Sequence, residues 1–273
     1  MTLDLVADSG ALRTHLDESD WAAVVLASAN PPLPEWAIPR VEPAVAAPDV
    51  AAPDVADALR EALDLRRRAV VVVEVASHDG RLGVLAELVT DLGGVLGLVR
   101  RLAVTAGGGP SGTQALHGVE VSATTSEHLV DEVVRLLPPA PGSPAPRSAD
   151  LAEVELPDEY TVAFGRALRT GDAVTVDAVC RDLGWAAPPP VMLALVHDLR
   201  GSAVVTVRTA RTAPVAAEWL LTGSGWVELV RTPRATVRHI PRRADEIRAS
   251  LVSALAAAFG ATLTTTDEEE RHG

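Results

Sequence analysis

The sequence predicts an α+β protein that contains two copies of a helix–ββββ–helix unit, related by a pseudo-two-fold axis, with an antiparallel sheet and helical subdomains. Two observations carry this prediction. Runs of β-branched residues bounded by turn residues follow one another in both halves of the chain, and each half closes with a segment of helical periodicity. A proline-rich segment, residues 138–148, divides the chain near its middle, and the elements on its two sides occur in the same order.

The first half is predicted to contain a helix, four strands and a second helix. Residues 55–67 place apolar side chains at helical spacing. Four strands are expected from apolar, mainly β-branched runs between turn residues, at 69–76, 82–90, 95–104 and 117–123. Thr124 and Glu127 have the spacing of a capping box, so they predict the start of a helix that continues to Leu137 and ends at Pro138.

The second half repeats this order. A short helix over 191–199 is followed by a long helix over 242–259, with four predicted strands between them, at 203–210, 214–222, 226–231 and 236–240. Two further helices precede this unit and form a helical subdomain, at 158–170 and 172–183. The segments 94–100 and 225–231 have equal length, begin with Gly and end with Leu-Val-Arg, which supports the duplication.

The boundaries between these parts follow from composition. The N-terminal half covers residues 1–137 and contains a Pro/Ala-rich insert at 39–54, which we expect to be an exposed loop. Residues 138–149 form the linker, and the C-terminal half covers 150–262. The charged end of the chain, 263–273, is expected to be a disordered tail.

One segment fits two kinds of element. Residues 82–92 also place leucines at helical spacing, with Gly93 in the position of a C-cap. A helix at this place would give the order strand–helix–strand–strand–helix, which resembles an ACT regulatory domain and implies a tandem small-molecule-binding regulator. The corresponding segment of the second half, 214–222, has three consecutive large apolar residues, which favours a strand in both copies.

The composition argues against several classes of function. The formal net charge is −13, which argues against a binder of nucleic acids or anionic membranes, since both need clustered positive charge. Cys180 is the single cysteine, which excludes an intramolecular disulfide and a Cys-rich metal site. The N-terminus has no basic flank before an apolar run, and no apolar stretch reaches the roughly 18 residues of a membrane helix. We therefore expect a cytoplasmic protein.

Residues with catalytic potential occur without the spacing that catalysis needs. None of the seven histidines belongs to an HxH or HExxH pattern. Residues 107–113 lack the Gly-Lys-Ser/Thr ending of a phosphate loop, and residues 223–225 are not the GxSxG of a nucleophile elbow. His78 and Asp79 are typical of a turn, and the acidic residues at 17–20 are typical of a helix cap or a solvated cluster. We expect no catalytic residues, no metal and no cofactor.

The layout resembles the EspG family of ESX (type VII) secretion-associated proteins. The resemblance is carried mainly by the second half, in the short helix before Arg200-Gly201, the strand 203–210, the hairpin 219–226 and the segment 237–241 that leads into the final helix. The first half matches through its meander and its closing helix, which ends at Pro138. This resemblance implies a non-enzymatic chaperone that binds the helical tip of a PE–PPE heterodimer in the cytosol and keeps it soluble for export.

A partner of this kind needs an apolar surface with a charged rim. We expect the strand 95–104 to lie at an edge of the sheet, with its leucines on one face and two arginines near its end. The predicted partner-binding residues lie on this strand and in a loop of the helical subdomain: Leu96, Leu98, Arg100, Arg101, Leu102 and Trp185. The expected partner is a helical secretion substrate resembling a PE–PPE heterodimer, with no nucleic acid and no membrane. The sequence leaves open whether the chain forms a homodimer.

Overall fold

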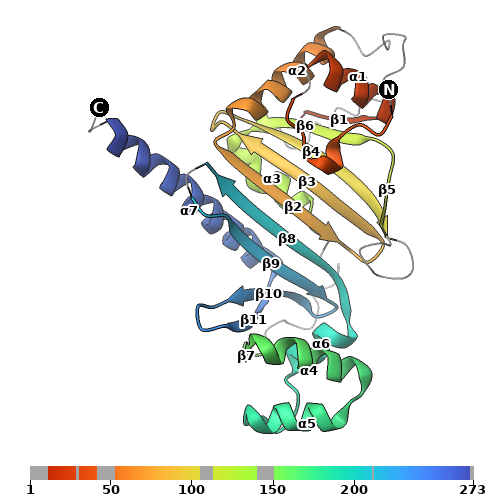
Figure 1. The fold of residues 1–273 in the computed structure, drawn as a ribbon, viewed down its shortest axis with the longest axis vertical. Helices are drawn as coiled ribbons and strands as arrows, with labels where there is room; N and C mark the ends of the chain where they lie inside the picture. Colours follow the sequence, from red (N-terminus) through yellow and green to blue (C-terminus); the bar gives the residue numbers. More distant parts are fainter. Residues whose placement is uncertain are drawn as a thin grey trace.

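The computed structural model describes residues 12–28, 31–41, 53–104, 113–139, 151–210 and 212–270. The strands of the N-terminal half are β1 (Leu12–Leu16), β2 (Val71–His78), β3 (Leu82–Thr90), β4 (Gly94–Val104), β5 (Thr113–Ala115) and β6 (Val119–Thr125). Those of the C-terminal half are β7 (Val154–Pro157), β8 (Leu199–Thr209), β9 (Val215–Thr222), β10 (Gly225–Arg231) and β11 (Thr236–Arg242). They form one sheet in the order β1-β6-β4-β3-β2-β8-β9-β10-β11-β7, with β5 paired to β4 (Figure 1).

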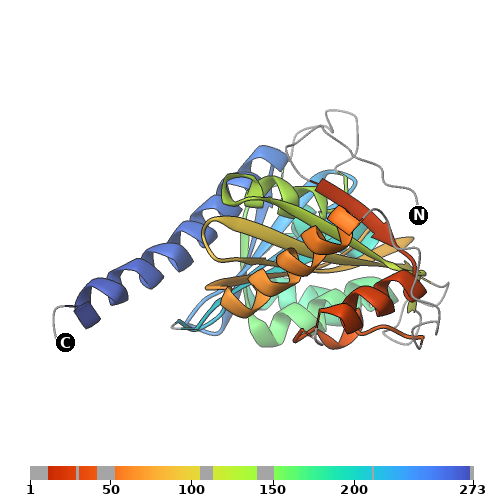
Figure 2. The same cartoon turned by 90° about the horizontal axis from the view of Figure 1, so that it is seen from above.

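The helices cover the two faces of this sheet differently. On one face, the N-terminal half carries α1 (Glu18–Ala27), the 3₁₀ turn η2 (Glu35–Ala37) and α2 (Pro53–Arg68). On the same face, the C-terminal half carries α4 (Asp158–Thr170), α5 (Ala173–Asp182) and α6 (Pro190–His197). The opposite face is covered by α7 (Ala244–Glu270) and by α3 (Leu129–Arg135), which follows the short turn η4 (Ser126–His128) (Figure 2).

The two halves repeat the same strand registers. Val75 of β2 lies opposite Ala86 of β3, and Val205 of β8 lies opposite Ala217 of β9 in the same way. The next hairpins match as well, since Leu88 pairs with Gly97 and Trp219 with Glu228. The halves join where β2 and β8 pair antiparallel over eight residues. The predicted duplication and the antiparallel α+β architecture are therefore confirmed, and the two sets of strands join in one sheet.

Three apolar clusters hold the layers together. The largest lies between the sheet and the helices α3 and α7, and it contains residues from both halves, among them Val75, Val205, Trp219 and Leu251. The second lies beneath α1, η2 and α2, and the third lies among α4, α5, α6 and the last strands. Since one cluster spans both halves, the sheet and its back helices form a common core.

Most predicted elements form where their patterns place them. Residues 82–90 form the strand β3, so the helix that the ACT-like alternative requires is not present there. The helix α4 has the predicted bounds, and α5 differs by one residue at each end. The predicted capping box is wrong: Thr124 lies inside β6 and no side chain caps η4 or α3. Glu127 accepts a hydrogen bond from Thr125 Oγ1.

Some expectations differ from the structure. The helix α7 continues to Glu270, through most of the predicted tail, and the sequence after Phe259 contains no proline that would end it. The chain is packed on α1 just before the Pro/Ala-rich insert, since Ala37 is buried and its carbonyl accepts a hydrogen bond from Trp21 Nε1 at 2.6 Å. Residues 42–52, 107–112 and 140–149, which include parts of the insert, the glycine-rich loop and the linker, lie outside the described residues.

Candidate protein-binding surface

The middle of the sheet is covered by helices on one face only. Residues of β2 and β8 that point towards α3 and α7 are buried, whereas the alternate residues are partly or fully exposed. In Figure 1 these strands lie in front, between the α1–α2 layer and the α4–α6 bundle, with no helix before them. The surface is formed mainly by Ala76, His78, Val204, Thr206, Glu218 and Leu220, and we call it the open face.

Small and apolar side chains form the centre of the open face. Register places Leu85, Ala76, Val204 and Glu218 in one row across β3, β2, β8 and β9. Such residues leave the backbone of the sheet accessible to a close partner, and an uncovered apolar surface of this kind is typical of an interaction site. The open face therefore has the composition of a docking surface for protein.

Charged groups lie at one end of the open face. Glu74 and Arg208 form an ion pair between neighbouring strands, and both side chains are more than 40% exposed. Beside them, Arg66 of α2 is paired with Glu87 of β3. Burial, together with the charge of Arg208, lowers the pKa of Arg66 to about 10, although Glu74 raises it. Arg66 stays positive near neutral pH. Glu87 is therefore neutralised by Arg66, and Glu74 by Arg208.

Tight turns meet at the other end of these strands. A Cβ atom added to Gly201 would collide with the carbonyl oxygen of His78, so the β2–β3 turn and the start of β8 are in close contact. Asp79 accepts hydrogen bonds from the backbone N–H groups of Arg81 and Leu82 at 2.9 and 2.7 Å. Burial raises the pKa of Asp79, but these hydrogen bonds lower it below its usual value. His78 and Asp79 thus form a turn, as the sequence predicts.

The predicted edge position of β4 is wrong. β4 lies inside the sheet between β3 and β6, and its outer part also pairs with β5. Leu96 and Leu98 do share a face, but that face is buried beneath α1 and α2, and each residue is 1% exposed. The alternation predicts which residues face the same way and gives no information on the neighbouring strands. Neither leucine is at a surface where a partner could contact it.

Arg100 is fully buried and belongs to an internal ion pair. Its guanidinium donates to the carboxylate of Glu18, the first residue of α1. Glu18 also accepts from the backbone N–H groups of Arg40 and Gly118, at 3.2 and 3.3 Å. Burial raises the pKa of Glu18, but the Arg100 and backbone hydrogen bonds lower it below its usual value. This pair fastens α1 and the segment after η2 to the sheet, so Arg100 is not a rim residue.

The other predicted site residues are partly accessible, but they do not share one surface, since Arg101 and Leu102 point to opposite faces of β4. Arg101 points to the α3 side of the sheet, where it approaches Glu120 at 3.3 Å, and Leu102 is half-buried. Trp185 lies after α5, and its ring centroid is 5.9 Å from that of Phe164 at an interplanar angle of 55°. Partner contact by Trp185 stays a prediction. The sequence reasoning missed the open face because the exposed side of β2 and β8 carries small and polar residues without a motif.

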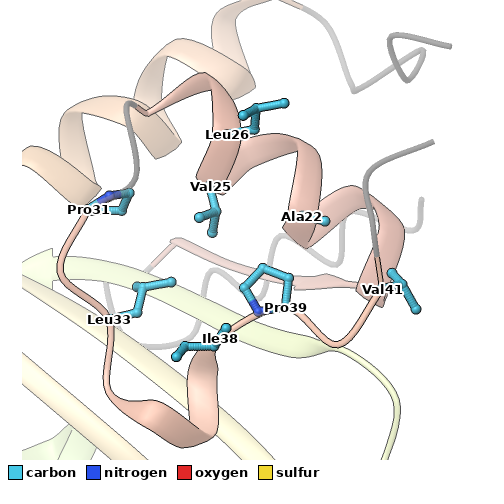
Figure 3. A pocket seen from close by; sticks show the side chains of 8 residues that line it. All are labelled: Ala22, Val25, Leu26, Pro31, Leu33, Ile38, Pro39 and Val41. Atoms are coloured by element: carbon cyan, nitrogen blue, oxygen red, sulfur yellow. The ribbon is translucent and has the colours of Figure 1, made fainter. Parts of the chain in front are cut away.

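A second apolar surface lies on the N-terminal layer. A cavity of about 340 Å³ opens between α1 and residues 31–41, and its lining is entirely apolar (Figure 3): Ala22, Val25, Leu26, Pro31, Leu33, Ile38, Pro39 and Val41. Leu26 and Ile38 are more than half exposed. This cavity carries no charged or hydrogen-bonding side chain, so its polar surface comes from the backbone alone.

Within residues 12–28, 31–41, 53–104, 113–139, 151–210 and 212–270, no cluster of three or more His, Cys, Asp or Glu side chains has the arrangement of a metal site. None of the helices in these ranges is long and apolar enough to cross a membrane.

Asp17 accepts hydrogen bonds from the N–H groups of Ser19 and Asp20, which confirms the cap at the start of α1.

Comparison with known proteins supports the fold. No family model and no curated protein matches the sequence. Among solved structures, the chain is similar to the Mycobacterium tuberculosis type VII secretion system chaperone EspG5, determined in complex with a PE25–PPE41 dimer. The TM-score is 0.57 at 12% sequence identity, over 89% of this chain and 96% of that chain. The chain therefore has an EspG-like fold, as its element layout predicts.

Proposed function

We propose that the chain is a non-enzymatic chaperone that binds a helical substrate of a type VII secretion system, of the PE–PPE kind, in the cytosol and keeps it soluble for export. The observation that carries the proposal is the open face at the centre of an EspG-like fold. The similar solved chaperone, EspG5, is bound to a PE25–PPE41 dimer.

The dimensions of the open face suit a helical partner. Its four central strands, β3, β2, β8 and β9, lie side by side, and neighbouring strands are about 4.8 Å apart, so they span about 14 Å. An α-helix with its side chains is about 10–12 Å wide, which allows one helix or the tip of a helical pair to lie between the two helical layers. An apolar tip covered in this way would be kept from aggregation.

The alternative function of an ACT-like regulator is disfavoured by the fold. Its unit requires a helix after the first strand, and β3 occupies that position and pairs with β2 over eight residues. The chaperone proposal and the fold agree at this point, since both copies of the unit are four-stranded antiparallel meanders.

Co-expression with PE–PPE heterodimers encoded in the same genome tests the proposal. The tagged chain is expected to form a stable complex with at least one heterodimer on size-exclusion chromatography and to raise the soluble fraction of that heterodimer. Ala76→Arg and Val204→Arg place bulky charges on the open face and should abolish the complex. Val252→Arg, at an exposed position of α7, is the matched control and should bind normally.

Two results would contradict the proposal. The first is the absence of a complex with every heterodimer tested. The second is normal binding by both open-face variants, which would move the docking site elsewhere on the fold. Circular dichroism and thermal melting of each variant show whether a loss of binding reflects a loss of structure.

A further inference from the structure

Glu218 stands out among the acidic residues of the open face. It is half-buried on β9, and its neighbours across the strands are Val204 and Leu229, both apolar. In the part of the chain that the structure describes, no hydrogen bond or ion pair joins its carboxylate to another group. Arg231 of β10 is engaged with Asp158 at 2.8 Å. Water therefore provides the hydration of this carboxylate while the open face is uncovered.

The duplicated fold shows what a residue at this position can bind. The equivalent of Glu218 in the N-terminal half is Glu87, which lies opposite Glu74 and Leu98 as Glu218 lies opposite Val204 and Leu229. Glu87 is buried, and its charge is met by Arg66, which comes down from α2 onto the sheet. On the C-terminal half, no arginine of the described helices takes the corresponding place beside Glu218.

A partner that covers the open face changes the energetics of Glu218. Removing an ionised carboxylate from water without a partner is strongly unfavourable, and a matching charge-assisted hydrogen bond offsets that desolvation cost. Glu74 does not need a basic group from the partner, because Arg208 already neutralises its charge. The uncompensated charge of the open face is therefore negative and lies at one position.

We propose that Glu218 receives a basic side chain from the tip of the helical substrate, which then occupies the place that Arg66 has beside Glu87. This inference rests on the proposed function and adds the chemistry of the substrate that the face selects. A substrate tip with Arg or Lys at this point is bound, and one with Asp or Glu is rejected, since like charges would be buried together.

The test uses a PE–PPE heterodimer that forms a complex with the wild-type chain. Its affinity is measured by isothermal titration calorimetry for the wild type, Glu218→Gln and Glu35→Gln, at low and high salt. Glu35 is an exposed carboxylate on η2, away from the sheet centre, and serves as the control. Glu218→Gln should weaken binding at least tenfold and reduce its salt dependence, whereas Glu35→Gln should stay within twofold of the wild type.

A charge reversal identifies the basic residue of the substrate. Each Arg and Lys of the substrate tip is changed to Glu in turn, and one of these variants should lose binding to the wild type and regain it with Glu218→Arg. Binding of Glu218→Gln within twofold of the wild type, or the absence of any rescued pair, would overturn the inference while leaving the chaperone function in place. Absence of a complex with the wild type would instead overturn the proposed function, and this inference with it.

Discussion

Val75 of β2 and Val205 of β8 lie directly opposite each other in the central antiparallel pair of the sheet, and each is 2% exposed. The same two valines occupy equivalent positions in the two halves, because their partners in the next strands, Ala86 and Ala217, match as well. The pseudo-two-fold axis therefore passes through this pair. Both side chains belong to the core beneath α3 and α7, which makes the junction of the halves as well packed as either half.

The packing of α7 on the sheet is a main source of stability. Leu251 is fully buried in the shared core, and Leu251→Ala should lower the free energy of unfolding by about 2–5 kcal/mol through lost burial and a cavity. The adjacent Val252 is 47% exposed, and Val252→Ala should change stability by less than about 1 kcal/mol. Urea denaturation followed by tryptophan fluorescence measures both. Equal losses in the two variants would show that α7 does not pack as described.

The buried ion pair between Arg100 and Glu18 gives a second prediction. Arg100→Gln leaves the Glu18 carboxylate inside without its cation, and should cost about 3–5 kcal/mol at pH 7. The control, Arg101→Gln, removes an exposed group and should cost less than about 1 kcal/mol. Chemical denaturation checks both values. A loss below 1 kcal/mol for Arg100→Gln would contradict the internal role.

The same pair has a pH dependence with a defined sign. Arg100 and backbone donors lower the pKa of Glu18 in the folded state, so its contribution is present above the unfolded pKa and is lost as the pH falls through the folded pKa. In Arg100→Gln this carboxylate is buried without its cation, so protonation relieves the penalty. The difference in stability between wild type and variant should therefore shrink as the pH falls from 7 towards 4. A constant difference over that range would exclude Glu18 as the cause.

His239 provides a further prediction, in the opposite part of the sheet. It is 2% exposed on β11, and burial lowers its pKa, while hydrogen bonds with the backbone of Val154 and Val237 raise it. The unfolded chain binds a proton at this residue before the folded chain does, so stability should fall as the pH drops from 7 to 5. His239→Gln should make that slope smaller in denaturation series at the two pH values. An unchanged slope would assign the pH dependence to other groups.

Cys180 gives a prediction about reactivity. The thiol is buried among the residues of the third cluster, and desolvation, followed by the charge of Asp177, raises its pKa. Since the thiolate is the reactive form, the native protein should react with Ellman's reagent very slowly at pH 8 and within minutes in guanidinium chloride. Fast reaction of the native protein would show that α5 opens readily. Gly184→Ala, which strains the left-handed residue after α5, should speed the native reaction.

The sequence predicts the long, regular elements well. The alternation of β2 and β8 and the periodicity of α4 are strong local signals, and the repetition of one element order in both halves makes β3 a strand. The sequence does not predict strands β1 and β7, because each has five residues or fewer and exposed polar side chains, so neither shows a clear pattern. Their presence depends on pairing with β6 and β11, which is a tertiary effect.

The candidate site was harder to predict than the fold. The leucines and arginines of β4 have the pattern of an exposed interaction strand, but α1, η2 and α2 cover Leu96 and Leu98, and the buried Glu18 makes Arg100 a core residue. A charged residue in a strand does not reveal whether its partner is solvent or a distant carboxylate. The open face in turn is a mixture of small, apolar and polar residues, and whether such strands are covered depends on where the helices lie. Which strands the helices leave uncovered is known only from the three-dimensional arrangement of the helices on the sheet.

Pairing through β2 and β8 also has a consequence for each half taken as a separate polypeptide. Either half alone would end its sheet in a long, regular edge strand whose N–H and C=O groups lack hydrogen-bond partners. Such an edge can pair with a strand of another chain. Because the junction is two-fold, a half could satisfy those groups with a second copy of itself in an isologous dimer as well as with its natural complement. The covalent connection thus ensures that the two unlike halves pair with each other. It also preserves their difference, in which Glu87 of one half pairs with Arg66 while Glu218 of the other half lies on the open face.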